Sequence, residues 1–219
     1  MTREELRTRI LYLLNEDPVD PVFFSEAQVN SMIQEAMEII AEEVTDLRKS
    51  AFINIEPGRY LYTIYEIAPD VMTPFRIWSE TRQERLDVIT LRQLDNARER
   101  ALQVTSDSPD WWYPVSHDTF GIWPGPVQSG SILRVDYLAW PETLNDEDEP
   151  EFRETEQDLI VLYGMYDGLI RQYEPERAID IFTTFSRQFR DQEFKNETRR
   201  FQRAHFNREH TGGHMVGEV

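Results

Sequence analysis

Apolar residues recur at spacings of three and four near both ends of the chain, and this periodicity limits the possible folds more than any other feature. Stripes of this kind are typical of amphipathic helices that bury one face. There are two stripes before residue 50 and two after residue 150. In chain order they comprise Leu6, Ile10, Leu13 and Leu14; Val29, Met32, Ile33, Ala36, Met37, Ile40, Val44 and Leu47; Leu159, Leu162, Tyr163, Tyr166, Leu169, Ile170 and Tyr173; and Ile179, Phe182, Phe185 and Phe189. The sequence therefore predicts two helices at each end.

Helix-start signals support these helices. In a capping box, a Ser or Thr oxygen accepts a first-turn backbone N–H, and the side chain three residues later reaches back. The pattern occurs at Thr2 with Glu5, Ser25 with Gln28, Thr90 with Gln93 and Thr155 with Asp158. The signal at Thr90 predicts a short helix at about 90–102 in the middle of the chain. Pro175 suits the first turn of the last helix, because Pro has no N–H to satisfy.

The middle of the chain has the composition of short strands. Its β-like runs are AFINI, RYLYTI, FRIWSE, RLDVIT, WWYPV, FGIW and SILRVDYLAW. Pro57-Gly58 predicts a type II turn, and the short connections favour antiparallel pairing. We predict an α+β fold. A helical bundle is formed by the N- and C-terminal helices, at residues 1–50 and 152–206, with a β-rich antiparallel insertion at 51–151 and a flexible C-terminal tail at 207–219.

The stretch from residue 109 to 143 holds four of the five Trp residues. Stacked aromatic residues can bind sugars or single-stranded nucleic acid, or they can fill the core of a small sheet. The alternation of Trp111, Tyr113 and Val115, and of Phe120 and Ile122, favours a sheet core, with Pro124-Gly125-Pro126 as a turn between strands. Trp123 and Trp140, each directly before a Pro, are candidate partner-binding residues.

Charge divides the chain into an acidic body and a basic end. The net charge is -18, which agrees with a soluble protein and also suits a surface that repels DNA. Near the C-terminus the balance reverses, and the cations there are Lys195, Arg199, Arg200, Arg203 and Arg208. A basic end on an acidic body indicates contact with an acidic partner or with another copy. Arg199, Arg200, Arg203 and Arg208 are therefore further candidate partner-binding residues.

The sequence predicts no catalytic, cofactor or metal site. The acidic run at 145–151 lacks the spacing of an EF-hand and is expected to be a solvated loop. His205, His210 and His214 are spaced by five and four residues, and the second interval crosses Gly212-Gly213, which disfavours a helical metal site. His117 and Asp118 point to opposite faces if they lie on a strand. A glycan-cleaving enzyme that uses two of the acids stays an alternative.

Targeting signals are also missing from the sequence. No run of about 18 apolar residues indicates a membrane span. The charged stretch MTREELRTRI does not resemble a signal peptide, and the chain contains no Cys, in keeping with a reducing compartment. We therefore expect an intracellular product.

Four segments in a fixed order carry a resemblance. They are TREELRTRILYLLNED with FFSEAQVNSMIQEAMEIIAEEV; FINIEPGRYLYTI; FGIWPGP with LRVDYLAWPETLNDEDEPEF; and LIVLYGMYDGLIRQYEPERAIDIFTTFSRQF. They look like the first two helices, the hairpin, the strand–turn–strand with its acidic loop, and the closing helix pair of another family. Together they span most of residues 2–190. In this order they resemble the head-to-tail adaptor (connector) proteins of tailed bacteriophages.

The resemblance implies a structural protein of the virion neck, made in the host cytoplasm. Such proteins form a ring, commonly of twelve copies. The ring binds the portal protein on one side and tail, nozzle or fibre components on the other. Double-stranded DNA would pass through the channel without specific binding, and no membrane is involved. The basic C-terminal segment becomes a candidate arm for docking on the portal or on a neighbouring copy. An alternative is a tail or fibre-attachment protein that binds a partner or sugar with its Trp-rich sheet.

Overall fold

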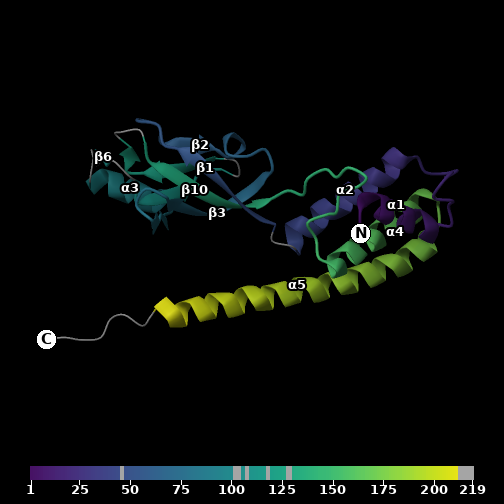
Figure 1. Cartoon of the computed structure of the whole chain (residues 1–219). Coiled ribbons are helices and arrows are strands. Elements are labelled where there is room, and N and C mark those ends of the chain that lie inside the picture. Colours follow the sequence, from purple (N-terminus) through teal and green to yellow (C-terminus); the bar gives the residue numbers. More distant parts are fainter. Residues whose placement is uncertain (45–46, 101–104, 107–108, 117–118, 127–129, 212–219) are drawn as a thin grey trace. The chain divides into compact units, whose positions relative to one another are not determined.

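The computed structural model divides the chain into two compact units, a helical unit made of Met1–Thr45 with Pro141–Val219 and a sheet unit made of Asp46–Trp140. The residues it describes are 1–44, 47–100, 105–106, 109–116, 119–126 and 130–211 (Figure 1). Helices at both ends and an antiparallel sheet region between them confirm the predicted α+β class. The domain limits drawn at 51 and 151 stay a prediction, because compactness alone does not show which part folds independently.

The helical unit contains α1 (Arg3–Leu13), α2 (Glu26–Glu43), α4 (Glu154–Arg171) and α5 (Pro175–Thr211). Both predicted capping boxes at its N-terminal helices are formed. At α1, the Thr2 hydroxyl accepts the Glu5 N–H at 3.2 Å and the Glu5 carboxylate accepts the Thr2 N–H at 2.9 Å. Ser25 and Gln28 cap α2 in the same way. Two orphan donors at each helix start are therefore satisfied locally.

The predictions for the other two helix starts had different outcomes. Thr90 and Gln93 make the predicted reciprocal contacts before α3 (Leu91–Arg100) in the sheet unit. The prediction at Thr155 is wrong, because α4 begins earlier. Arg153 is its N-cap, and the Glu156 carboxylate accepts the Arg153 N–H at 2.9 Å. Glu has the side-chain length that this reach requires, and Asp158 is shorter.

Helix α5 starts at Pro175, as expected, and continues for 37 residues. It runs past residue 206, so the backbone at 207–211 is helical, and the flexible tail drawn at 207–219 stays a prediction. Residues 212–219 of the predicted tail lie outside the described part of the chain.

The four helices pack around the predicted stripes. Every stripe residue from Val29 to Val44 on α2 is buried. Helix α1 approaches α4 closely because Gly164 and Gly168 face Ile10 and Leu14. A Cβ on Gly168 would lie 2.4 Å from a Leu14 methyl carbon. Small residues one turn apart on α4 therefore set the spacing between α1 and α4.

Aromatic rings join α4 to α5. The ring centroids of Tyr163 and Phe185 are 5.7 Å apart, and those of Tyr166 and Phe182 are 5.0 Å apart. Moving three residues forward on α4 thus means moving three back on α5, so the two helices are antiparallel. The Tyr163 hydroxyl also donates to Glu35 on α2 at 2.7 Å. Burial and this carboxylate both raise the pKa of Tyr163, so the phenol stays protonated.

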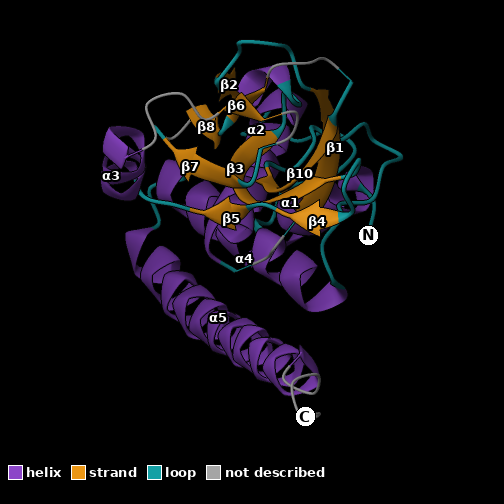
Figure 2. Ribbon diagram, turned by 90° about the vertical axis from the view of Figure 1, so that its left-hand side faces the viewer, coloured by secondary structure: helices purple, strands orange, loops and turns teal. Residues whose placement is uncertain are grey.

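The sheet unit contains two four-stranded sheets and one short ladder (Figure 2). In the first sheet, β10 (Ile132–Ala139) lies between β1 (Arg48–Asn54) and β3 (Val71–Ser79), with β4 (Glu84–Arg85) at the edge. The second has the order β2 (Leu61–Thr63), β8 (Thr119–Trp123), β7 (Trp111–Pro114) and β5 (Asp87–Val88). The ladder pairs β6 (Thr105–Ser106) with β9 (Gly125–Pro126), and η1 (Ile64–Glu66) is a short 3-10 helix after β2.

The strand pairing corrects several predictions. The FINIEPGRYLYTI segment is not a hairpin, because β1 pairs with β10 and β2 pairs with β8. The type II turn itself is confirmed: the Arg59 N–H donates to the Glu56 carbonyl at 3.2 Å, and Gly58 has φ 74. Gly125-Pro126 forms β9 rather than a turn. Two short pairs, β5–β7 and β6–β9, are parallel. The chain between β5 and β7 includes α3, which is long enough for a crossover.

The Trp-rich stretch forms a sheet core, as predicted. Phe120 and Ile122 are fully buried, and Phe120 packs against Tyr62 and Trp112 with ring centroids 5.8 and 6.3 Å away. The expected alternation fails on β7, where Trp112 and Tyr113 are both buried. Adjacent strand residues point to opposite faces, so the second sheet is covered on both faces here.

A charged network lies on the opposite face of β10 from its apolar residues. Asp136 is buried, although alternation places it with Arg134 on the polar face. Its cross-strand neighbours are Ser50 on β1 and Arg76 on β3. The Ser50 hydroxyl donates at 2.6 Å, Arg76 forms an ion pair, and Arg134 Nε lies 3.2 Å away. Burial would raise the pKa of Asp136, but the Ser50 and Arg76 hydrogen bonds outweigh it and lower the pKa.

The burial of Phe120 predicts a large cavity penalty. Phe120→Ala should lower the free energy of unfolding by about 3–5 kcal/mol. The matched control, Phe52→Ala on β1, removes a ring that is 65% exposed and should change it by less than about 1 kcal/mol. Urea unfolding of both variants checks this. Equal losses would contradict the assignment of Phe120 to the core.

The Asp136 network predicts a pH dependence. A carboxylate with a depressed folded-state pKa contributes stability above its unfolded pKa of about 4, and this contribution is lost as the pH falls through the folded value. Asp136→Asn should therefore flatten the fall in stability below about pH 4, whereas Asp87→Asn on β5 should not. The measurement is urea unfolding between about pH 3 and pH 7. An unchanged acid limb in Asp136→Asn would contradict this role.

Candidate assembly interface

The start of α1 is held by the acidic loop that precedes α4. The Arg3 N–H donates to the Asp148 carbonyl at 3.0 Å, and the Glu4 N–H donates to the Asp146 carbonyl at 3.2 Å. Asp146 also accepts from the guanidinium groups of Arg3 and Arg7, each at 2.8 Å. These hydrogen bonds lower the pKa of Asp146. The prediction of a merely solvated loop is therefore wrong at Asp146, which ties the two sequence halves of the helical unit together.

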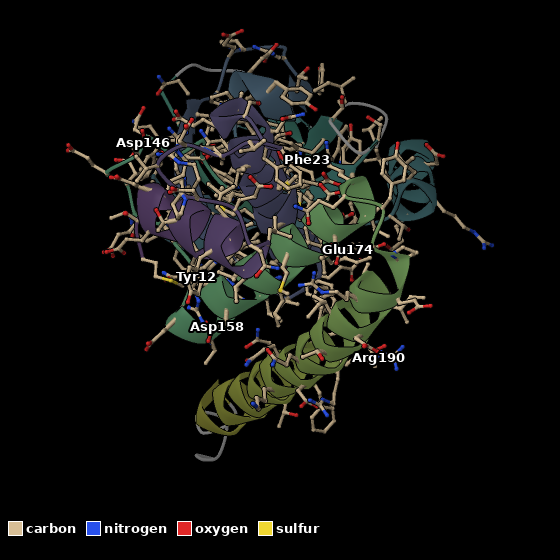
Figure 3. All side chains as sticks on the ribbon, turned by 90° about the vertical axis from the view of Figure 1, so that its right-hand side faces the viewer. Tyr12, Phe23, Asp146, Asp158, Glu174 and Arg190 are labelled. Carbon is tan, nitrogen blue, oxygen red and sulfur yellow. The ribbon has the colours of Figure 1, made fainter. Side chains whose placement is uncertain are left out.

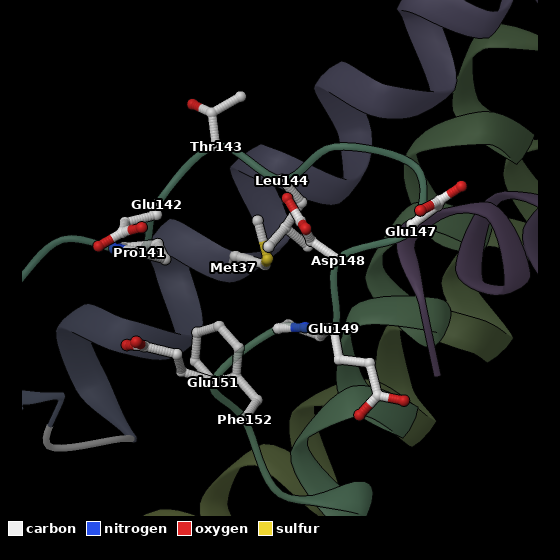
Figure 4. Close-up of a pocket in the computed structure, with 11 residues that line it drawn as sticks. Met37, Pro141, Glu142, Thr143, Leu144, Glu147, Asp148, Glu149, Glu151 and Phe152 are labelled. Carbon is white, nitrogen blue, oxygen red and sulfur yellow. The ribbon is translucent and has the colours of Figure 1, made fainter.

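The same loop borders a cavity of about 400 Å³ over Met37 of α2 (Figure 4). Its carboxylates include Glu147, Asp148 and Glu149, which point in different directions rather than toward one point. Asp148 instead accepts two hydrogen bonds from Asn145. Among the described residues, no group of three His, Cys, Asp or Glu could hold a metal ion. The cavity is therefore not assigned a ligand.

One end of the helical unit exposes apolar side chains. We call this end the tip and define it as the loop at residues 15–24, the α4–α5 turn at 172–174, and Tyr12. Gln172 Nε2 joins turn and loop by lying 3.5 Å from the Leu14 carbonyl and from Glu16 Oε1. Figure 3 looks onto this end and labels Tyr12, Phe23 and Glu174. The exposed fractions are 74% for Tyr12, 92% for Val19, 96% for Val22, 50% for Phe23 and 89% for Tyr173.

Hydrogen bonds fix the tip loop in this outward arrangement. The Glu16 carboxylate accepts the backbone N–H groups of Val22 and Phe23 at 2.8 and 3.2 Å. Asp17 accepts the Val19 N–H at 2.9 Å. Pro18 and Pro21 restrict the backbone further. The loop therefore holds its Val side chains in solvent without support from an apolar neighbour.

The turn between α4 and α5 places Tyr173 in a conformation that favours Gly. Its φ is 61, and the next N–H, that of Glu174, closes the end of α4 by donating to the Leu169 carbonyl at 2.9 Å. Helices commonly end in this way, with Gly at the left-handed position. A large aromatic residue there costs backbone energy and gains no burial. Residues in such conformations cluster at functional sites.

Helical periodicity made its clearest error beside the tip. Ile170, Tyr173, Ile179 and Phe182 fit the predicted core stripes, yet they are 45%, 89%, 63% and 46% exposed. Helix α4 buries one face against α1 and α2, and α5 packs on α4 alone among the helices with substantial contact. The stripe on α4 and α5 is consequently wider than the surface that covers it.

Comparison with known proteins shows the family of this chain. The family model described as SU10 adaptor protein matches residues 1–208. The chain belongs to the SU10 adaptor protein family. No curated protein matches it. Family membership supports a structural phage protein that associates with other virion components. In the part of the chain that the structure describes, no helix is long and apolar enough to cross a membrane.

The adaptor's predicted contact residues belong to different elements. Trp123 ends β8 of the second sheet, where it is half-buried opposite Trp111. Trp140 follows β10 of the first sheet and is 37% exposed. The backbone of Arg199, Arg200, Arg203 and Arg208 belongs to α5, but their side chains lie outside the described residues. The same holds for the side chains of His205 and His210 and for all of His117, Asp118 and His214.

Charge at the adaptor tip is unbalanced. Residues 15–24 contain three acids and no base. Two cations beside the α4–α5 turn already form ion pairs, Arg171 with Asp167 at 2.8 Å and Arg177 with Glu174. Among the described residues, Asp17 and Asp20 have no cationic partner. The sequence predictions did not include this site, although the repeated Pro-Val pairs beside acids in EDPVDPVFF are a visible signal.

The role of Glu16 is testable. Glu16→Ala removes the acceptor of two backbone N–H groups, and a hydrogen bond to a charged group contributes about 1.5–3 kcal/mol. Amide exchange at Val22 and Phe23 should therefore accelerate by roughly tenfold or more. Asp20→Ala, which removes an acid from the same loop, should leave these rates unchanged. Exchange that is equally slow in wild type and Glu16→Ala would show that the carboxylate does not order the loop.

Proposed function

We propose that this protein is a head-to-tail adaptor that forms a ring, of twelve copies, on the portal of a tailed phage. The ring extends the DNA channel and provides a platform for tail or nozzle components. The family match over residues 1–208 is the observation that carries this proposal. The exposed apolar tip supports it, because apolar clusters of this kind mark protein–protein contacts.

The acidic composition suits a channel wall. Each copy carries a net charge of -18, so a ring of copies presents a strongly negative surface to a DNA backbone of the same sign. Like charges repel within about 8 Å at physiological ionic strength. DNA would therefore pass through the channel during packaging and ejection without binding specifically to its wall.

We propose that the basic residues of α5 and two Trp residues form the contacts to other proteins. Arg199, Arg200, Arg203 and Arg208 are concentrated on the last part of α5, in a chain that is otherwise acidic. Cations grouped in this way favour binding to an acidic surface on the portal or on a neighbouring copy. Trp140, 37% exposed, and the half-buried Trp123 are proposed contacts for tail or fibre components.

Co-assembly with the portal protein tests the function. Native mass spectrometry and negative-stain images of the full chain mixed with portal should show twelve adaptor copies on the portal ring. Failure to bind portal, together with absence from neck density in virions, would reject the proposal. Sugar binding or sugar hydrolysis by the purified protein would favour the fibre-attachment or enzyme alternative.

Charge reversal on α5 tests the arm. Replacing Arg199, Arg200 and Arg203 by Glu should weaken ring or portal association by roughly tenfold or more, with an unchanged melting temperature. The control reverses Arg85 and Arg92, which are exposed on the sheet unit, and should leave association intact. A collapse of the melting temperature in the Arg199, Arg200 and Arg203 variant would instead assign these residues to the fold.

A further inference from the structure

Helix α5 extends beyond the other helices of its bundle. Continuing the ring register between α4 and α5 places Glu154, the first residue of α4, opposite Phe194. Asn196 still reaches the bundle, since its amide donates to the Val44 carbonyl at the end of α2. The helical backbone then continues over residues 197–211 for about 22 Å, at a rise of about 1.5 Å per residue. We call residues 197–211 the arm; it lies at the C-terminal end of α5 in Figure 1.

The arm differs in composition from the rest of the chain. It contains four Arg and two Glu, in a protein with a net charge of -18. It also contains the apolar residues Phe201 and Phe206. Basic and aromatic residues on a projecting helix suit an acidic, apolar acceptor.

The tip has the complementary composition, and it lies at the opposite end of the same unit. Helix α5 starts at the tip, because Gln172, in the turn that precedes the helix, contacts Glu16. The arm is the far end of the same continuous helix of 37 residues. A helix of that length is about 55 Å long and does not fold back. The arm therefore cannot reach the tip of its own chain.

We infer that the arm of one copy docks on the tip of a second copy. The contact would place Phe201 and Phe206 against the exposed Val19 and Val22, with arm Arg residues near the unpaired tip carboxylates. The inference rests on the proposed function only in that copies of the adaptor assemble with one another. Beyond that function, the inference specifies which two surfaces of the adaptor meet.

Three features favour a second copy as the occupant. The two surfaces are opposite in charge and both contain apolar residues, so the contact would neutralise tip acids that otherwise repel the acidic body of a second copy. The tip loop is held by its own hydrogen bonds, so docking needs little further ordering. The two surfaces lie at opposite ends of one unit, which makes a head-to-tail contact. Such contacts repeat from copy to copy and generate a ring when the rotation closes.

The absence of native Cys provides a direct test. Full-length Val19→Cys and Phe201→Cys proteins are mixed under mild oxidation, and the rate of mixed disulfide formation is measured. The control pairs Phe201→Cys with Tyr65→Cys, because Tyr65 is 61% exposed on the sheet unit. The tip–arm pair should cross-link at least about tenfold faster than the control, a difference of about 1.4 kcal/mol. Equal rates overturn the inference.

Charge reversal adds a rescue test. Asp17→Lys with Asp20→Lys in the Val19→Cys protein should slow the cross-link by roughly tenfold. Arg199→Glu with Arg203→Glu in the Phe201→Cys partner should then restore it. If the rescue fails, the ion-pair contact between arm and tip is rejected, even when the Val19→Cys and Phe201→Cys proteins with unchanged charges still cross-link. Circular dichroism checks each variant, and Val22→Cys replaces Val19→Cys if that protein does not fold.

The outcomes separate this inference from the proposed function. Rings on the portal without faster tip–arm cross-linking would reject the inference and leave the adaptor function intact. Faster tip–arm cross-linking in a protein that never binds portal would reject the portal function and leave the contact intact. Cross-linking between portal and arm, with none between tip and arm, would show that the portal is the occupant.

Discussion

The contact of Asp146 with Arg3 and Arg7 holds the helical unit together. The unit is interrupted in sequence by the whole of the sheet unit, so its two N-terminal helices meet α4 only after a long loop is closed. Loop-closure entropy grows slowly with length, but it must still be offset by contacts that bridge the two halves. The acidic loop supplies such contacts at the start of α1, where it accepts two backbone N–H groups and two Arg side chains.

The placement of α1 then determines the tip. With its first turn held by the loop, α1 lies along α4, where Gly164 and Gly168 leave room for Ile10 and Leu14. The chain leaves α1 at Leu14, whose carbonyl lies 3.5 Å from Gln172 at the end of α4. Glu16 follows directly and organises the loop that exposes Val19 and Val22. The geometry of the exposed end therefore depends on an ion-pair cluster at the opposite end of α1.

Local sequence signals predicted the elements well, and they failed where tertiary partners decide the outcome. Thr2, Ser25 and Thr90 were identifiable as caps because a capping box is complete within four residues. The apparent hairpin at Pro57-Gly58 was misread because a type II turn fixes the local bend but not the partners of its flanking strands. Asp136 was assigned to a polar face by alternation. Its burial depends on Ser50 and Arg76, which are distant in sequence.

The interface was the part of the molecule that periodicity could not locate. A stripe indicates which residues avoid water, but it does not say whether the same chain or another covers them. Ile170, Tyr173 and Ile179 fit the helical stripe, and only their exposed fractions of 45%, 89% and 63% show that the described helical unit leaves them uncovered. Conflicts between local pattern and observed burial are expected at functional sites. Here they occur together at one end of one unit.

Charge explains why a contact between copies must be so specific in its placement. Copies with a net charge of -18 repel one another, and this repulsion opposes non-specific association through exposed Val and Tyr residues. Close approach is therefore favourable only where the sign reverses locally. Most of one copy offers no such surface to its neighbour, whereas the Arg residues of the α5 arm do. In the proposed ring, the acidity that suits a DNA channel would thus also restrict where two copies can meet.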